Sequence, residues 1–403
     1  MADPLPNRGL PNNIGLAGSR VGYQPPPATL PPHLQRSGSR ILTNTQGAPA
    51  QQPREKKPEK ARKSIISFPS DRNGCGFYRT IIPFNYLISK HEYDCSELFT
   101  FNFDLNFITR ASTIRFQRQV TDAQVHVMRE YKKVITNTPN SNANIVYEID
   151  DLVHEIEMSN IVAYQFYTPT RRNNMIEAMR LSDKVTVSTE FLKQYYEDKF
   201  DVQNIHVIPN YLPKFLWQDK GKRDKSGKGK KPRILWAGSA SHVGRGGDLE
   251  FLLPLIKKTK KEFQWVFFGV IPPELKGKPE YEFHEWADFW SYPHALDQID
   301  ADVALCPIKD TVFNYGKSDL KILEYTALNI PFIASSIGNG LGPYDLVDGI
   351  NIVENDADSW YNAIKQLATD GPTRDKYMKA AQAELTKRWL EDEDNIQKYL
   401  DVY

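Results

Sequence analysis

The sequence predicts an α/β protein made of two doubly wound domains that follow a disordered N-terminal arm. Three observations support this prediction. The chain has 403 residues, which exceeds the usual size of one domain. From residue 64 onward, short apolar runs alternate with amphipathic segments, a pattern typical of a mostly parallel sheet flanked by helices. The alternation restarts after residues 219–231, a Lys/Gly-rich stretch without an apolar residue.

Residues 1–63 form the predicted arm. They hold eleven of the 27 prolines and show neither helical nor strand periodicity, as in segments that bury too little apolar surface to fold. The arm carries a net charge of +7 and residues 219–231 a net charge of +5, so the rest of the chain sums to −11 within a total of +1. We therefore expect basic flexible parts and an acidic folded part.

Each half of the chain then supplies its own strands and helices. In the first half we expect strands at residues 64–68, 105–108, 144–149, 184–187 and 205–208, with helices at 77–89, 175–181 and 190–196. In the second half we expect strands at residues 233–238, 265–268, 303–307, 331–335 and 350–353, with helices at 249–259, 319–328 and 358–368. Residues 374–400 are expected to be helical with a break near 391–394. The predicted divisions are a first domain at 64–218, a linker or loop at 219–231, a second domain at 232–385 and a terminal helix at 386–403.

The composition argues against several classes of protein. Hydrophobic residues make up 40% and charged residues 25% of the chain, so a large core is expected. Cys75, Cys95 and Cys306 are far apart and lack CxxC spacing, which argues against a disulfide framework or a zinc site. No apolar run approaches the length of a membrane span and no secretory pattern opens the chain. We expect a protein of the bacterial or infected-host cytoplasm.

A glycine-rich turn follows the first predicted strand. It contains Gly74 and Gly76 and leads into Tyr78 and Arg79. Glycines let a ligand approach the backbone, and the amides at a helix start favour an anion. The turn is shorter than a dinucleotide fingerprint, so a tight turn without a ligand explains it equally well.

Two carboxylates, Asp150 and Asp151, end an apolar strand. Ligands of open parallel sheets collect at the carboxyl ends of strands. Adjacent residues of a strand point to opposite faces, so we expect at most one of the two carboxylates in a cleft, and both are alternatively helix caps.

A Gly/Ser-rich loop follows the strand at 233–238. Gly238, Ser239, His242 and Arg245 lie in it, before Asp248. Such a loop before a helix is typical of an anion cradle, with His242 and Arg245 as phosphate contacts. A surface loop capped by Asp248 is the alternative interpretation.

The helix at 319–328 carries the last group of candidates. Lys317 lies in the turn before it, and Lys321 and Glu324 lie on its less apolar side. A carboxylate accepts both hydroxyls of a ribose, and lysines offset a diphosphate. An ordinary i,i+3 salt bridge between Lys321 and Glu324 explains the same pair.

Together these segments resemble the GT-B fold of two Rossmann-like domains that face each other across a cleft. Within that fold they are similar to a bacterial and phage group of retaining, family 4-like glycosyltransferases that carry an E-x7-E motif. The resemblance spans about residues 64–403 and rests on four motifs in order: Tyr78-Arg79 with Pro83; the sequence YEIDD at 147–151; Gly238, Ser239, His242 and Asp248; and the sequence KSDLKILEY at 317–325.

The resemblance implies roles for individual residues. Glu324 is the second motif glutamate and binds the ribose, and Ser239, His242 and Arg245 lie near the diphosphate together with Lys317 or Lys321. Eight residues before Glu324 stands Gly316 instead of the first motif glutamate. Lys317 is expected to take over part of its role. The remaining candidates divide into a catalytic group and a donor-binding group. The catalytic group is Asp150, Asp151, Lys317 and Arg245, and the donor-binding group adds Gly238, Gly74, Gly76, Tyr78 and Arg79.

The resemblance also implies the reaction. A nucleotide-sugar donor, with UDP as the first expected nucleotide and GDP as the second, loses its sugar with retention of configuration and without a bound metal. No DxD pair has to be interpreted as a metal site, and Asp150 and Asp151 are adjacent and lack that spacing. The C-terminal domain holds the donor, the N-terminal domain holds the acceptor, and the final helix crosses back to the N-terminal domain.

The acceptor stays open among a hydroxymethylated base in phage DNA, a glycan and a protein side chain. The basic arm and residues 219–231 favour DNA, whereas the net charge of −11 on the rest of the chain opposes it. A different class of function stays open as well. It is a non-catalytic protein of the virion that binds a nucleotide sugar or a polyanion on the same fold.

Overall fold

The computed structural model describes residues 62–101, 105–221, 231–243 and 246–403. These residues belong to one compact unit that covers residues 59–403. The predicted arm up to residue 61 and residues 222–230 of the predicted linker lie outside the described residues, and so does Arg245.

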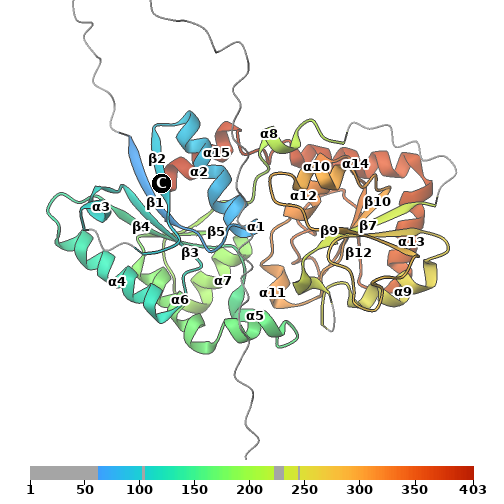
Figure 1. The fold of residues 1–403 in the computed structure, drawn as a ribbon, viewed down its shortest axis with the longest axis horizontal. Helices are drawn as coiled ribbons and strands as arrows, with labels where there is room; N and C mark the ends of the chain where they lie inside the picture. Colours follow the sequence, from blue (N-terminus) through green and yellow to red (C-terminus); the bar gives the residue numbers. More distant parts are fainter. Residues whose placement is uncertain (1–61, 102–104, 222–230, 244–245) are drawn as a thin grey trace, which may run out of the picture. The chain divides into compact units, whose positions relative to one another are not determined.

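Two parallel six-stranded sheets form two lobes (Figure 1). The N-terminal sheet has the order β2-β1-β3-β4-β5-β6 and the C-terminal sheet the order β12-β11-β10-β7-β8-β9. The N-terminal strands are β1 (Lys63–Phe68), β2 (Tyr93–Glu97), β3 (Thr113–Gln117), β4 (Asn144–Ile149), β5 (Lys184–Val187) and β6 (Ile205–Val207). The C-terminal strands are β7 (Arg233–Gly238), β8 (Gln264–Gly269), β9 (Tyr281–Glu285), β10 (Val303–Cys306), β11 (Phe332–Ser335) and β12 (Ile352–Val353). The predicted α/β class with two doubly wound sheets is confirmed.

Helices cover both faces of each sheet. In the N-terminal lobe they are α1 (Gly74–Gly76), a π-helical turn (Phe77–Ile81), α2 (Ile82–Lys90), α3 (Leu105–Arg110), α4 (Asp122–Asn137), α5 (Ile161–Phe166), α6 (Pro169–Leu181) and α7 (Glu190–Phe200). After α8 (Lys214–Trp217), the C-terminal lobe contains α9 (Leu253–Thr259), α10 (Tyr292–Asp297), α11 (Val312–Tyr315), α12 (Leu320–Ala327), α13 (Ala357–Thr369) and α14 (Gly371–Leu385), and α15 (Glu393–Val402) follows. Short 3₁₀ turns lie at Val153–Glu155, Ala240–His242 and Glu250–Leu252.

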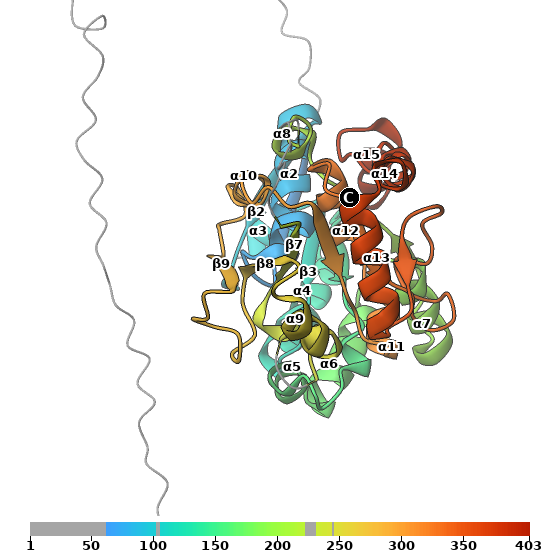
Figure 2. The same ribbon diagram turned by 90° about the vertical axis from the view of Figure 1, so that its right-hand side faces the viewer.

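The alternation of side chains along each strand builds two apolar layers per sheet. In the C-terminal sheet, Leu235 and Ala237 of β7 pack with α10 and α12, whereas Ile234 and Trp236 pack with α9 and α13. Figure 2 shows α9 and α12 on opposite sides of this sheet. The central strands β7, β8, β10 and β11 are buried on both faces, which explains why they read as continuous apolar runs.

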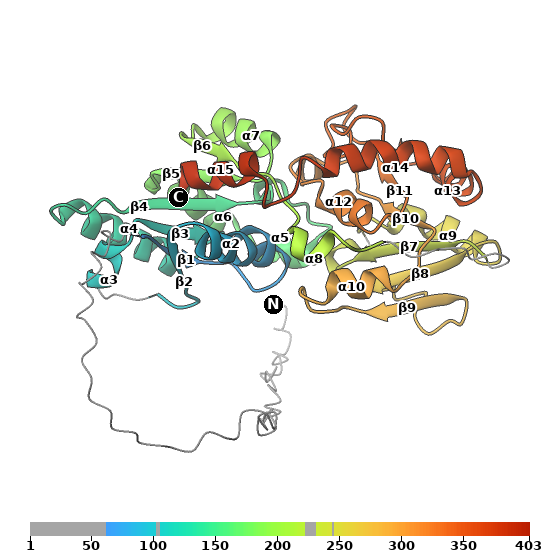
Figure 3. The same cartoon turned by 90° about the horizontal axis from the view of Figure 1, so that it is seen from above.

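The last helix packs against the N-terminal sheet. Figure 3 shows α14 over the C-terminal lobe and α15 over the N-terminal one. The hydroxyl of Tyr403 accepts a hydrogen bond from Nε of Arg115 on β3 at 2.9 Å, and Nζ of Lys184 on β5 donates to the carbonyl of Asp401 at 2.8 Å. Leu212 and Leu390 pair through a backbone bond of 3.0 Å, so the two chain crossings between the lobes lie side by side.

One predicted strand is wrong. Residues 105–108 lie in helix α3, and the strand that pairs with both β1 and β4 is β3. An apolar run of four residues does not distinguish a buried strand from a buried helix turn. Strand β3 was missed because its alternate positions are Arg115 and Gln117, which are polar but fully buried.

The strand orders place a crevice at one end of each sheet. The chain leaves β1 for β2 on one side and later returns to β3 on the other, and β7 likewise lies between β8 and β10. Ligands of doubly wound sheets bind at such switch points, at the carboxyl ends of the strands. The turn with Gly74 follows β1 and the loop with Ser239 follows β7, so both predicted glycine-rich segments lie at these points.

Candidate functional site

A cleft of about 690 Å³ is lined by residues of both lobes. Its size falls within the range of about 300–1,000 Å³ that is usual for small-molecule sites. Most predicted site residues of the described part line it: Gly74, Tyr78, Arg79, Asp150, Asp151, Gly238, Ser239, His242, Lys317, Lys321 and Glu324. Gly76 is the exception, and Arg245 cannot be placed because it lies outside the described residues.

Gly76 serves the turn and not the cleft. A Cβ atom on it would lie 1.8 Å from the carbonyl oxygen of Asp71, and its amide donates to Oδ1 of Asp71 at 3.1 Å. Glycine is therefore required for the fold of this turn. Gly74 lies two residues earlier, on the cleft wall.

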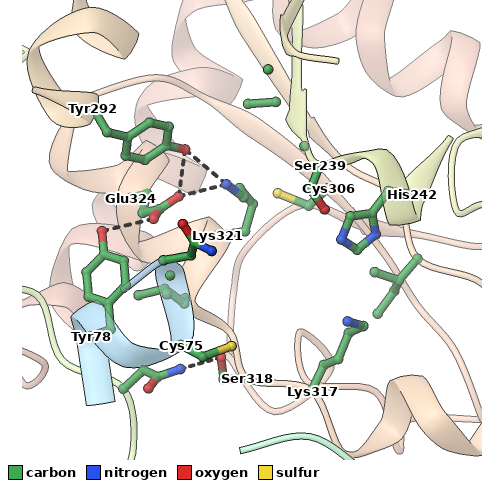
Figure 4. Close-up of a pocket in the computed structure, with 18 of the residues that line it drawn as sticks. Cys75, Tyr78, Ser239, His242, Tyr292, Cys306, Lys317, Ser318, Lys321 and Glu324 are labelled. Atoms are coloured by element: carbon green, nitrogen blue, oxygen red, sulfur yellow. Dashed lines mark hydrogen bonds and ion pairs between the residues drawn. The ribbon is translucent and has the colours of Figure 1, made fainter. Parts of the chain in front are cut away.

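Glu324 lies at the centre of a buried polar cluster that joins the lobes (Figure 4). Its Oε1 accepts from the hydroxyl of Tyr78 at 3.1 Å, and its Oε2 accepts from the hydroxyl of Tyr292 at 3.0 Å and from Nζ of Lys321 at 2.8 Å. Glu324 is only 3% exposed. The i,i+3 salt bridge between Lys321 and Glu324 is present, with the carboxylate buried and the lysine side chain 27% exposed. Burial lowers the pKa of Lys321, but Glu324, Tyr325 and Cys306 together outweigh burial, so the net shift is upward.

Arg79 lines the cleft with a guanidinium that is already bound. Its Nε donates to Oε1 of Glu148 at 2.7 Å, and one terminal nitrogen donates to Ile208 and to Asn210. The side chain is 4% exposed. Arg79 thus connects the turn after β1 to β4 and β6, with little capacity left for a ligand.

Arg118 holds Asp150 and Asp151 at the carboxyl end of the N-terminal sheet. Its Nε pairs with Asp150 and a terminal nitrogen with Asp151. Burial raises the pKa of Asp150, whereas for Asp151 burial is outweighed by Arg118 and Lys317, which lower its pKa. Both carboxylates face the cleft, contrary to the expectation that at most one would enter it, because residues after the strand end no longer alternate.

Arg118 itself adopts a left-handed backbone with φ of 51°. That conformation is uncommon for a residue with a side chain, and such residues concentrate at functional sites. Sequence reasoning missed Arg118 because strand β3, which it directly follows, was not predicted.

The loop after β7 positions His242 on the cleft wall. Gly238 is required at its start, because a Cβ atom there would lie 2.5 Å from Cζ2 of Trp236. Nδ1 of His242 lies 2.6 Å from Oδ2 of Asp248. In Figure 4, His242 and Ser239 lie on the opposite side of the opening from Glu324 and Tyr78.

Lys317 and Gly316 precede helix α12. Lys317 lines the cleft, and its Nζ lies 4.8 Å from the ring centre of Phe313. Gly316 packs against the N-terminal lobe, since a Cβ atom there would lie 2.9 Å from Cβ of Leu152 and 3.1 Å from Cδ2 of Leu192. This close packing leaves no room for a glutamate at the position.

Aromatic residues that the sequence analysis did not single out complete the wall. Trp286, Phe289 and Tyr292 line the cleft, and the rings of Trp286 and Tyr292 stack with centres 5.2 Å apart. They follow β9, a strand that sequence reasoning missed, and no motif marks them. Flat apolar surface beside a polar cluster is typical of a site for a ligand with a ring.

The described residues hold no cluster of three His, Cys, Asp or Glu side chains arranged for a metal ion. Cys75, Cys95 and Cys306 carry free thiols. Within the described ranges, none of the helices is both long and apolar enough to cross a bilayer.

Comparisons with known proteins identify the fold. No protein-family model matches the chain, and no curated protein matches it either. Solved structures do match. Sucrose-phosphate synthase from Thermosynechococcus elongatus has a TM-score of 0.59 at 14% identity, covering 85% of this chain and 98% of that one.

Two further structures contain a donor. An α-glucosyltransferase in complex with UDP-glucose and DNA containing an abasic site has a TM-score of 0.57 at 13% identity, covering 85% of this chain and 99% of that one. HepE from Anabaena in complex with UDP-glucose has a TM-score of 0.57 at 12% identity, covering 84% of this chain and 100% of that one. The described chain thus has the GT-B fold that these glycosyltransferases share.

Proposed function

We propose that the protein is a glycosyltransferase that transfers a sugar from a nucleotide-sugar donor, bound in the interlobe cleft chiefly by the C-terminal lobe. The observation that carries the proposal is the arrangement of the cleft. A buried carboxylate, Glu324, lies on one side and the loop with His242 on the other, at the switch point of the C-terminal sheet. Structural neighbours with the same fold bind UDP-glucose, and we take a UDP-sugar as the first donor to test and a GDP-sugar as the second.

In this proposal Glu324 binds the ribose. A carboxylate offers about four acceptor positions, and the two hydroxyls of a ribose match one edge of it. Tyr292 and Lys321 hold the carboxylate from within the C-terminal lobe. The stacked rings of Trp286 and Tyr292 lie beside it and provide an apolar wall for the base.

The donor diphosphate then lies toward Ser239, His242 and Lys317. Departure of the nucleoside diphosphate leaves negative charge on the phosphate, and fixed donors aimed at that oxygen stabilise the transition state. Lys317 supplies a cation and the loop after β7 supplies polar groups without a metal. We propose that Arg245, which lies in the same loop sequence, adds a second cation.

Asp150 and Asp151 face the cleft from the N-terminal lobe, where we propose that the acceptor binds. Their pairing with Arg118 fixes their positions. The oxocarbenium-like sugar gains from a carboxylate on this side, and Asp151, with the lowered pKa, is the better candidate. Attack from the face of the leaving group would retain the anomeric configuration.

We propose a hydroxymethylated base in DNA as the acceptor to test first. One structural neighbour was solved with DNA, and two segments of this chain carry net charges of +7 and +5. Phosphate contacts by such segments release counterions, so DNA binding should weaken steeply as salt rises. Transfer to a glycan or to a protein instead would overturn the choice of acceptor and leave the proposed donor unchanged.

The test is a thermal-shift panel of UDP, GDP, ADP and their sugars, followed by release of the nucleoside diphosphate and transfer to modified DNA. Glu324→Gln should weaken donor binding and lower kcat/KM by about ten- to 100-fold, the loss expected for one hydrogen bond to a charged group. Glu280→Gln, which changes a surface carboxylate paired with Lys260, is the matched control. Glu324→Ala is a poor test, because it leaves Tyr78, Tyr292 and the half-buried Lys321 without their common acceptor and so destabilises the fold as well.

One outcome would reject the role of Glu324, and another would reject the enzyme. Full activity of Glu324→Gln would reject the ribose role of Glu324. Binding of a sugar nucleotide without release of nucleoside diphosphate to any acceptor or to water would favour a non-catalytic binding protein, for which the glycine at position 316 is the supporting observation.

A further inference from the structure

The side chain of His242 is held by a single strong contact. Its Nδ1 lies 2.6 Å from Oδ2 of Asp248. Its Nε2 has no hydrogen-bond partner among the residues that the structure describes, and His242 lies on the cleft wall. The state of Nε2 therefore decides what the ring offers to a ligand.

Asp248 is fixed in place as an acceptor. Its Oδ1 accepts from the amide of Lys309 at 2.8 Å and from Nδ2 of Asn314 at 3.1 Å, and the residue is 7% exposed. Burial raises the pKa of the Asp248 carboxyl. Its hydrogen bond to His242 and the charges of His242 and Lys317 lower the pKa by more than burial raises it, so the net shift is downward. An ionised carboxylate only accepts hydrogen bonds, so Nδ1 of His242 carries a hydrogen.

This arrangement selects one tautomer of the neutral ring. With the hydrogen on Nδ1, a neutral imidazole has a lone pair on Nε2 and only accepts hydrogen bonds there. Nε2 gains a hydrogen only when the whole ring is protonated. A phosphate oxygen accepts hydrogen bonds, so it is bound by the protonated ring and repelled by the neutral one.

We propose that Asp248 is a positioning residue that forces His242 to take up a proton before Nε2 can bind the diphosphate of the donor. The inference rests on the proposed function, since it places the diphosphate at the loop after β7. It makes the affinity for the donor depend on pH through one residue of the loop.

The surroundings of His242 contain charges of both signs. Asp248 accepts its Nδ1 hydrogen. Across the cleft, Asp151 lies close enough for His242 to lower the pKa of that carboxyl. Lys317 influences both Asp151 and Asp248. Two further charged residues contact the loop at Gly246. Nζ of Lys309 donates to the carbonyl of Gly246, and Glu250 accepts from its amide.

The experiment measures the affinity of the whole protein for UDP-glucose by calorimetry across the range in which histidines change charge, about pH 5 to 8. UDP-glucose is used because its diphosphate, esterified at both ends, keeps a constant charge over this range. We expect the affinity of the wild-type protein to fall about tenfold from the acid to the neutral end, the loss of one hydrogen bond between charged groups. His242→Ala should bind about tenfold more weakly at the acid end and show no such fall.

Asp248→Asn gives the sharper readout. The amides of Lys309 and Asn314 still require an acceptor at Oδ1, so the NH₂ group of the new asparagine faces His242 and donates to Nδ1. The neutral ring then carries its hydrogen on Nε2 and binds phosphate without taking up a proton. We expect this variant to lose most of the pH dependence while it still binds UDP-glucose. His284→Ala, which removes a half-buried histidine paired with Glu282, should behave like the wild type.

Three results would overturn the inference: an affinity of the wild type that does not change with pH, an unchanged pH dependence in His242→Ala, or an unchanged pH dependence in Asp248→Asn. Each of them leaves the proposed function in place, since the donor still binds. Failure of the wild type to bind any nucleotide sugar at any pH rejects the proposed function first, and the inference with it.

Discussion

Tyr78 occupies a position that a ribose bound to Glu324 would need. The carboxylate of Glu324 offers about four acceptor positions, and Tyr78, Tyr292 and Lys321 already use three of them. A ribose brings two hydroxyls, so one existing donor must leave. Tyr78 is the one that comes from the other lobe, and its bond of 3.1 Å is the longest of the three.

The substitution Tyr78→Phe removes this competitor. Burial, and after it the negative charge of Glu324, raises the pKa of Tyr78. The hydroxyl therefore stays protonated and donates at every working pH. A hydrogen bond to a charged group contributes about 1.5–3 kcal/mol. Since about 1.4 kcal/mol corresponds to tenfold in affinity, we expect Tyr78→Phe to bind UDP about ten- to 100-fold more tightly, while the unliganded protein loses stability by a similar free energy.

Calorimetry with UDP and with pyrophosphate separates the ribose from the phosphates. The gain in affinity of Tyr78→Phe should appear for UDP and be absent for pyrophosphate, which has no ribose. Tyr147→Phe is the matched control, because it removes a buried hydroxyl that donates to the carbonyl of Gln119 within the N-terminal lobe and should change only stability. An affinity for UDP that is unchanged or weaker in Tyr78→Phe would refute the competition between the phenol and the ribose.

Three further predictions concern packing and pH. Gly316→Glu should lose about 1–3 kcal/mol of stability through overpacking against Leu152 and gain no transfer activity; a chemical denaturation curve equal to that of the wild type would contradict this. Burial lowers the pKa of His154 to about 4, below the value near 6.5 in an unfolded chain, so the stability that the neutral ring contributes is complete above about pH 6.5 and is lost as the pH falls toward 4. A plot of unfolding free energy against pH should therefore be steeper on the acid side for the wild type than for His154→Gln. Parallel plots would exclude the effect. Tyr403→Phe removes an acceptor of the buried Arg115, so the free energy of unfolding measured in urea should fall by about 1–3 kcal/mol. An unchanged unfolding midpoint would show that α15 docks without this bond.

Much of the fold was predictable because most strands are buried on both faces. Residues 144–149 and 233–238 each hold a run of consecutive apolar residues and were assigned with the same bounds as β4 and β7. Strand β3 could not be found in this way, since the partners that satisfy Arg115 lie as far along the chain as Tyr403. Charged residues inside a sheet become interpretable only when the residues that face them are known.

The candidate site was predictable in its residues and not in its contacts. Glu324, Lys321 and Tyr78 were each selected from a local motif, yet the bond between Tyr78 and Glu324 spans 246 positions of the sequence. Local spacing left a surface pair open for Lys321 and Glu324, whereas the fold buries the carboxylate and half-buries the lysine. Arg118 and Tyr292 belong to no motif and follow strands that were missed, so only the coordinates could reveal them.

The contacts between the lobes divide into those that a ligand would displace and those that it would leave. Arg388 bonds to Asp319 at the start of α12 and to the carbonyl of Asn210, and Nδ2 of Asn210 donates to Ser318 at 2.8 Å. These contacts lie where the two chain crossings run side by side, and none of them involves Glu324. The bond between Tyr78 and Glu324 is different, because its acceptor belongs to the proposed ribose site. A nucleotide that takes this acceptor therefore breaks one connection between the lobes, whereas the bonds of Asn210 and the packing of Gly316 against Leu152 do not involve that acceptor.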